Sequence, residues 1–250
     1  MSTNHFKSPL MRLRRASENL SKLDKCVANY FKKQPYRKTV EHVPEENMDH
    51  HKVVLTKSFP ERATNLAVEA IEGFRSSLDQ AAYASACYAG REGSKFASFP
   101  IVANEEDLEV RIKGASKDLP EEAKEVIRSY KPFKEGNQSL FLLNELCNSN
   151  KHRLIVPVGM GTAGVKYQDM TISGTGSIPV PKWNKEKQEL VFGSFQPGTE
   201  FKYNVEISFY AAFDASEASG LSVIDTMREI EEEVRNIIRD MRLGVTGGDD

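Results

Sequence analysis

The apolar residues of this 250-residue chain change their period near residue 152, and this change constrains the fold more than any other feature. Between residues 10 and 31 apolar side chains recur at alternating steps of three and four, which is the stripe of a long amphipathic helix. Between residues 201 and 213 they alternate with polar side chains, as in a strand that buries one face. Helical segments followed by strands predict an α+β protein.

The helical part is predicted to occupy residues 1–152. It begins with the long N-terminal helix, continues through a small β-hairpin at 36–59, and then enters a second long helix that Ser58-Phe59-Pro60-Glu61 opens. Apolar periodicity predicts three more helices at 105–113, 120–130 and 138–151. These helices together should form the core.

The second part, residues 153–243, is predicted to hold an antiparallel sheet of about four strands and a C-terminal amphipathic helix packed on the core. Strands are expected at 153–158, 165–172, 189–195 and 201–213, because glycine- and proline-rich turns separate these stretches. Heptad-spaced apolar residues predict the last helix at 221–243. Gly244 should end it, which leaves 244–250 as a disordered tail.

Two short motifs resemble ligand sites, but their surroundings favour simpler interpretations. Residues 159–164 match GxGxxG, yet the next segment alternates like a strand, whereas a dinucleotide site needs a helix there. We interpret this segment as a hairpin turn and expect no cofactor. Asp49, His50 and His51 lie in an acidic loop without a third ligand cluster at a suitable spacing, so we interpret them as solvated and predict no metal site.

The composition favours a cytoplasmic protein without a membrane span. The longest unbroken apolar run holds five residues, whereas a membrane span needs about 20. No apolar stretch follows the basic N-terminus, so a secretory signal is not expected. The three cysteines are widely separated and form no CxxC motif, which indicates a reducing compartment rather than a disulfide framework.

The net charge of −2 conceals a strong asymmetry between the two ends. Residues 1–40 carry ten Lys or Arg against two acids, and residues 214–250 carry ten acids against four Arg. The basic first helix could attract nucleic acid. Alternatively, the two ends attract each other, either within one chain or across a homodimer that pairs the terminal helices.

The candidate catalytic residues come from two helices. Arg75 and Asp79 share a face of the second long helix, since they are four residues apart. Asn144, Asn148 and His152 recur every four residues on a later predicted helix. A guanidinium can hold a phosphate in a fork, and a neutral imidazole can move protons near pH 7. Arg75 and His152 are therefore the candidate catalytic pair for metal-free RNA cleavage, with the 2′-hydroxyl as nucleophile. The candidate substrate-binding residues are Asp79, Asn144, Asn148, Lys151 and Arg153.

The same residues could instead form a buried structural network. Arg75 would then pair with Asp79 or Glu72, and His152 would cap its helix or satisfy backbone groups. The protein would be a non-catalytic interaction or scaffold protein. Arg75 and His152 in one open, positive cleft would favour catalysis, whereas complete hydrogen bonding of both in the interior would favour the scaffold.

Several short motifs follow one another in a fixed order between residues 65 and 158. They are FRSSLDQ at 74–80, FPI at 99–101, LPEEA at 119–123, KPF at 131–133 and NKHRL at 150–154. The series resembles a widespread family of uncharacterised bacterial proteins, whose versions read LRSALDH, FPI and DKHRL. That family carries no established activity.

The first of these motifs is also similar to the RxxxxH signature of HEPN-type helical ribonucleases. Arg75 matches the arginine, and Gln80 occupies the histidine position, so His152 is the candidate to do the work of that histidine. The resemblance implies a HEPN-like bacterial protein that engages RNA or a nucleotide, as a metal-independent ribonuclease in stress or phage defence. It would also suit a homodimer, because HEPN-type clefts form between paired helical domains.

Overall fold

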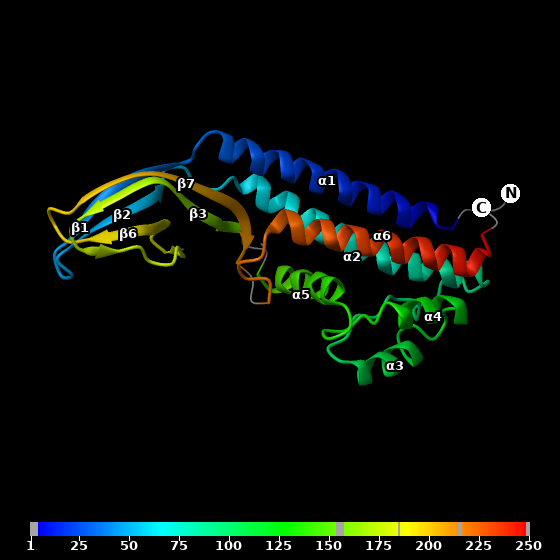
Figure 1. Ribbon diagram of the computed structural model, residues 1–250. Coiled ribbons are helices and arrows are strands. Elements are labelled where there is room, and N and C mark those ends of the chain that lie inside the picture. Colours follow the sequence, from blue (N-terminus) through cyan, green and yellow to red (C-terminus); the bar gives the residue numbers. More distant parts are fainter. Residues whose placement is uncertain (1–4, 154–157, 185, 215–216, 249–250) are drawn as a thin grey trace.

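The helices of this protein gather at one end and most of its strands at the other, which gives an elongated molecule (Figure 1). The computed structural model describes residues 5–153, 158–184, 186–214 and 217–248. The helices are α1 (Lys7–Lys32), α2 (Glu61–Tyr88), α3 (Glu105–Lys113), α4 (Glu121–Ser129), α5 (Gln138–Arg153) and α6 (Val223–Thr246). The strands are β1 (Tyr36–Val43), β2 (Met48–Leu55), β3 (Val158–Ser173), β4 (Gly176–Ser177), β5 (Trp183–Asn184), β6 (Glu189–Phe195) and β7 (Glu200–Phe213). This order confirms the predicted α+β class.

Three long helices, α1, α2 and α6, lie side by side and form the main core (Figure 1). The predicted stripe of α1 is buried, and each large aliphatic side chain in it contributes roughly 1.5–3 kcal/mol before the entropy cost. The helices approach closely at Gly73, where an added Cβ would lie only 2.8 Å from the Cβ of Ala16. None of the helices in the described part of the chain is both long and apolar enough to cross a membrane.

The C-terminal helix α6 packs against α1, α2 and α4. Its Ser222 cap accepts a hydrogen bond from the Asp225 N–H, and its heptad stripe is buried as predicted. The helix continues through Gly244, however, and ends at Gly247, which adopts a left-handed backbone with φ 67°. A Cβ added at Gly244 would lie 3.8 Å from Glu122 and from Val126, so the helix passes close to α4 where it continues beyond the predicted end.

The strands form two antiparallel sheets around a second, smaller core. One sheet has the order β1-β2-β6-β4, with β5 also paired to β6, and the other is a long ribbon of β3 and β7. Val53, Leu190, Phe192 and Val205 are the buried residues between them. Because β2 pairs with β6, the hairpin at 36–59 lies in the same sheet as strands from beyond residue 153.

The segment 159–164 is part of a strand, so the predicted hairpin turn there is wrong. β3 runs without interruption through all three glycines and pairs with β7, with Gly161 opposite Tyr210. The register shifts between Thr162 and Gly164, and a glycine inside a strand often accompanies such a bulge. The segment is therefore a bulged strand, and no helix opens at its third glycine.

Candidate functional site

Arg75 and Asp79 form an ion pair on α2, as their four-residue spacing predicts. Arg75 Nη1 lies 3.2 Å from Asp79 Oδ1, at an angle unsuited to a hydrogen bond. Arg75 Nη2 donates to the carbonyl oxygen of Phe99 at 2.9 Å, and Asp79 Oδ1 accepts from the Phe99 N–H at 3.1 Å. The two side chains therefore bind both polar groups of one residue's backbone.

The Arg75–Asp79 pair, which we call the clamp, holds a segment whose backbone needs hydrogen-bond partners. Phe99 is 1% exposed and belongs to the main core, but the segment 99–101 has no regular secondary structure to satisfy its backbone. Buried N–H and C=O groups need hydrogen-bond partners. Arg75 and Asp79 supply those partners, so the fork that was predicted to hold a phosphate already binds a carbonyl oxygen.

The polar stripe of α5 lies beside α2 without joining this clamp. Asn144 and Asn148 are partly buried, and neither makes a hydrogen bond to Arg75 among the described side chains. Cys147 Sγ approaches the Ile71 carbonyl oxygen at 3.7 Å, and α5 runs antiparallel to α2 (Figure 1). Beyond Cys147 the helix therefore advances toward the start of α2, whereas Arg75 lies on the other side of Ile71, one turn closer to the end of α2.

The side chains of Lys151, His152 and Arg153 lie outside the described residues, although their backbone belongs to α5. Their predicted roles thus stay predictions.

Gln80, which occupies the histidine position of the RxxxxH signature, accepts a hydrogen bond from Ser8 Oγ at 2.9 Å. It connects α2 to the first turn of α1.

The histidines of the predicted acidic loop lie in β2, because the turn is shorter than expected and includes Asn47 at φ 51°. Asp49 pairs with His42 at 2.8 Å, and His50 pairs with Glu46 at 3.0 Å. His51 is packed among Phe192, Phe195, Phe201 and Tyr203, and this burial lowers the pKa of its imidazole. The interpretation of all three as solvated loop residues is therefore wrong for His51.

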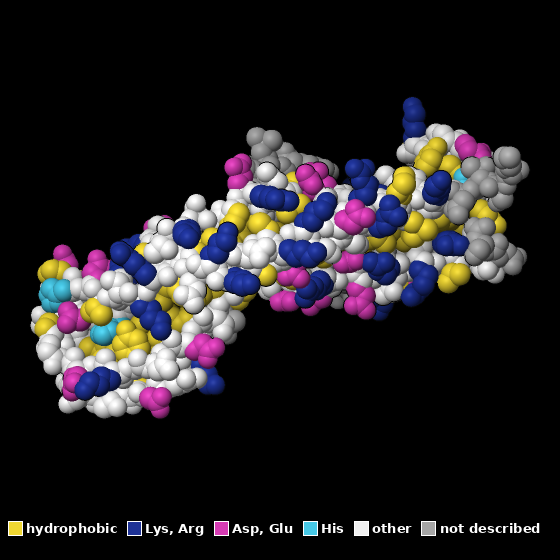
Figure 2. Space-filling model, turned by 90° about the horizontal axis from the view of Figure 1, so that it is seen from above, with side chains coloured by type: hydrophobic (Ala, Val, Ile, Leu, Met, Phe, Trp, Pro, Cys, Tyr) yellow, Lys and Arg dark blue, Asp and Glu magenta, His cyan; other side chains and the backbone are white. Residues whose placement is uncertain are grey.

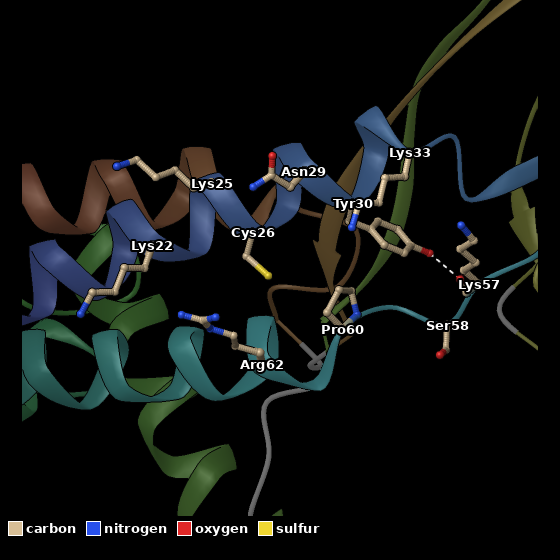
Figure 3. A pocket seen from close by; sticks show the side chains of 10 residues that line it. All are labelled: Lys22, Lys25, Cys26, Asn29, Tyr30, Lys33, Lys57, Ser58, Pro60 and Arg62. Atoms are coloured by element: carbon tan, nitrogen blue, oxygen red, sulfur yellow. Dashed lines mark hydrogen bonds between the residues drawn. The ribbon is translucent and has the colours of Figure 1, made fainter.

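A cationic groove lies where the end of α1 meets the start of α2 (Figure 3). It has a volume of about 480 Å³. Its Lys and Arg residues, which we call the groove cations, are Lys22, Lys25, Lys33, Lys57 and Arg62. No Asp or Glu is among the described residues that line it. The groove cations are exposed, so their charges are in contact with solvent.

Two carboxylates of α1 are engaged elsewhere. Asp24 pairs with Arg228 of α6 at 2.5 Å, and Glu18 pairs with Arg14 at 3.5 Å. Within the described part of the chain, none of the groove cations has an ion pair. Their charge is therefore available to an anion from outside the chain.

Tyr30 fixes one wall of the groove to the other. Its hydroxyl donates to the Lys57 carbonyl oxygen at 2.6 Å, which joins α1 to the linker before α2 (Figure 3). Burial raises the pKa of Tyr30 to about 12, so the hydroxyl keeps its proton and remains a donor at neutral pH. The groove is thus a fixed part of the fold.

The opposite charges of the terminal helices do not neutralise this surface. α1 and α6 pack within one chain, which agrees with one of the two alternatives. Polar contacts between them include Arg228 with Asp24 and Ser17 with Glu231, and in these two α1 contributes an acid and a hydroxyl rather than a cation. Lys and Arg side chains remain spread over the exposed face that includes α1 (Figure 2).

The groove was missed as a site because its two walls are distant in the sequence. The ten cations in residues 1–40 were the available signal for one wall, but nothing local connects them to Lys57 and Arg62. Comparison with protein-family models, curated proteins and solved structures finds no match for the chain.

Proposed function

We propose that this protein binds RNA through the cationic face formed by α1 and the start of α2, without cleaving it. The observation that carries the proposal is the groove, which five Lys and Arg side chains line without a lining carboxylate or an ion pair among the described residues. Phosphate contacts from such side chains supply most of the sequence-independent affinity of proteins for nucleic acid. The proposed setting is the cytoplasm of a bacterium.

Binding without cleavage is proposed because of what Arg75 does. Its guanidinium holds the Phe99 carbonyl and the Asp79 carboxylate, which supports the structural-network alternative for these two residues. Metal-independent cleavage by Arg75 and His152 is therefore not part of the proposal. A role in stress or phage defence rests on the family resemblance alone.

A homodimer through the terminal helices is also not part of the proposal. Val223, Met227, Ile230, Val234 and Ile237 of α6 are already buried within one chain, as is the stripe of α1. The apolar surface that suggested a partner copy is therefore already covered.

The test is titration of a labelled RNA oligomer with the purified protein, followed by fluorescence anisotropy. Five phosphate contacts on a single strand predict that log K falls with log salt at a slope of about −3.5. The RNA should remain intact in the presence and absence of EDTA, as judged on a denaturing gel. Absence of binding at about 50 mM salt would refute the proposal, since electrostatic binding is strongest at low salt.

A further inference from the structure

The groove cations come from two walls. Lys22 and Lys25 belong to α1 and Lys33 caps its C-terminal end, whereas Lys57 lies in the linker before α2 and Arg62 in its first turn (Figure 3). A ligand between these walls would have positive charge on both sides. We propose that the groove holds the phosphate backbone of a single RNA strand, in preference to a duplex. This inference rests on the proposed function and specifies the ligand of the same site.

The size of the groove favours one strand. About 480 Å³ corresponds to roughly sixteen water molecules at their share of liquid volume, which is room for a short stretch of one backbone. A duplex is wider and holds its strands in a rigid helix, so it would contact the rim and leave the walls unused. Proteins that bind single strands without sequence preference commonly use a positively charged groove that follows the backbone.

The groove offers little means of reading bases. Tyr30 is the one aromatic among the described lining residues, and it is only 7% exposed, with its hydroxyl bound to Lys57. Base recognition in single-stranded RNA usually relies on stacking against exposed aromatic rings. Binding should therefore depend on the number of phosphates and on strandedness, with little dependence on base sequence.

The experiment compares two double variants of the full chain that remove the same charge. The groove variant is Lys33→Gln/Arg62→Gln, with one change in each wall. The control is Arg14→Gln/Lys32→Gln, which removes one arginine and one lysine from α1 positions outside the groove lining. All four side chains are exposed, so melting temperatures should stay close to that of the wild type.

Three ligands are titrated at several salt concentrations: single-stranded RNA, a scrambled single strand of the same length, and a duplex of that length. We expect the wild type to bind both single strands equally and more tightly than the duplex. The groove variant should bind single strands on the order of tenfold more weakly, with a salt slope smaller by about 1.4, because two phosphate contacts are lost. The control should lose at most about twofold, with little change in slope.

Each alternative outcome overturns the inference. Equal losses in the two variants would show diffuse attraction to the whole face, which would leave the proposed function intact. Duplex binding as tight as single-strand binding would refute the preference for one strand. A doubled mass in light scattering that the groove variant abolishes would show that the groove binds an acidic surface of a second copy instead. Absence of RNA binding by the wild type would refute the proposed function as well.

Discussion

Arg62 and Arg75 belong to one helix, yet their surroundings differ completely. Arg75 is in the middle of α2, its side chain is 21% exposed, and it binds Asp79 and the backbone of Phe99. Arg62 is in the first turn, is exposed in the groove, and has no ion pair among the described residues. The motif in which an arginine occurs therefore does not determine its role. The role depends on whether buried backbone groups of the same chain already use the guanidinium.

The largest effect expected from this comparison is the loss of stability in Arg75→Ala. The substitution removes the donor to the Phe99 carbonyl and the positive charge beside Asp79, and a lost hydrogen bond of this charged kind costs about 1.5–3 kcal/mol. Urea unfolding should measure this loss. Arg75→Lys should recover only part of it, because an ammonium cannot reproduce the planar fork.

Arg62→Ala is the matched control on the same helix, and its stability should change by less than about 0.5 kcal/mol, since its side chain is exposed and unpaired among the described residues. RNA affinity should show the opposite order. Arg62→Ala should bind RNA more weakly than the wild type, whereas folded Arg75→Ala should bind it with unchanged affinity. Equal stability of Arg75→Ala and the wild type would mean that the clamp is dispensable. Loss of RNA affinity in folded Arg75→Ala would return Arg75 to the binding site.

Local features of the fold could be predicted from the sequence, whereas contacts between distant segments could not. Helical periodicity is local, so α3 was predicted at its observed bounds and α1 within three residues at its start. The pairing of β2 with β6 joins segments more than a hundred residues apart, and no local pattern indicates it. The continuity of β3 was missed because its glycines look like a turn unless the length of its partner β7 is known.

The candidate site follows the same rule. The four-residue spacing predicted the ion pair of Arg75 with Asp79, but not that both would bind Phe99, which is 20 or more positions away. The charge count indicated the basic first helix, but Lys57 and Arg62 join it only through the packing of α2 on α1. Spacing within a helix is readable from a sequence, whereas the partner across the fold is not.

A smaller effect is expected where Tyr30 joins the two walls of the groove. Tyr30→Phe removes the hydrogen bond to Lys57 and should cost about 1 kcal/mol in urea unfolding. It should also weaken RNA binding a few-fold, because the linker that carries Lys57 is no longer held against α1. Unchanged affinity would show that the position of this linker does not matter for binding.

The pH dependence of that hydrogen bond provides a separate check. Burial raises the pKa of Tyr30 in the folded protein to about 12, above its usual value of 10.0, so folding favours the protonated hydroxyl. The stabilisation is therefore complete below about pH 10 and declines as the pH rises from about 10 toward 12. The difference in urea midpoint between the wild type and Tyr30→Phe should narrow over this interval. A constant difference would show that the hydroxyl is not shielded from solvent.

The smallest effect is expected at the exposed ion pair of Arg228 and Asp24. This pair is more exposed than the partly buried pair of Arg75 and Asp79, but unlike the groove cations it has a partner. The two side chains are 58% and 42% exposed, so water and salt screen their attraction. A double-mutant cycle with Arg228→Ala and Asp24→Asn should give a coupling of about 0.5 kcal/mol at low salt, and less as salt is added. The terminal helices would then be held together by their apolar stripes, with charge adding little. A coupling near that of the Arg75 clamp would reverse this ranking, since exposure would no longer separate the arginines that hold the fold from those left available to RNA.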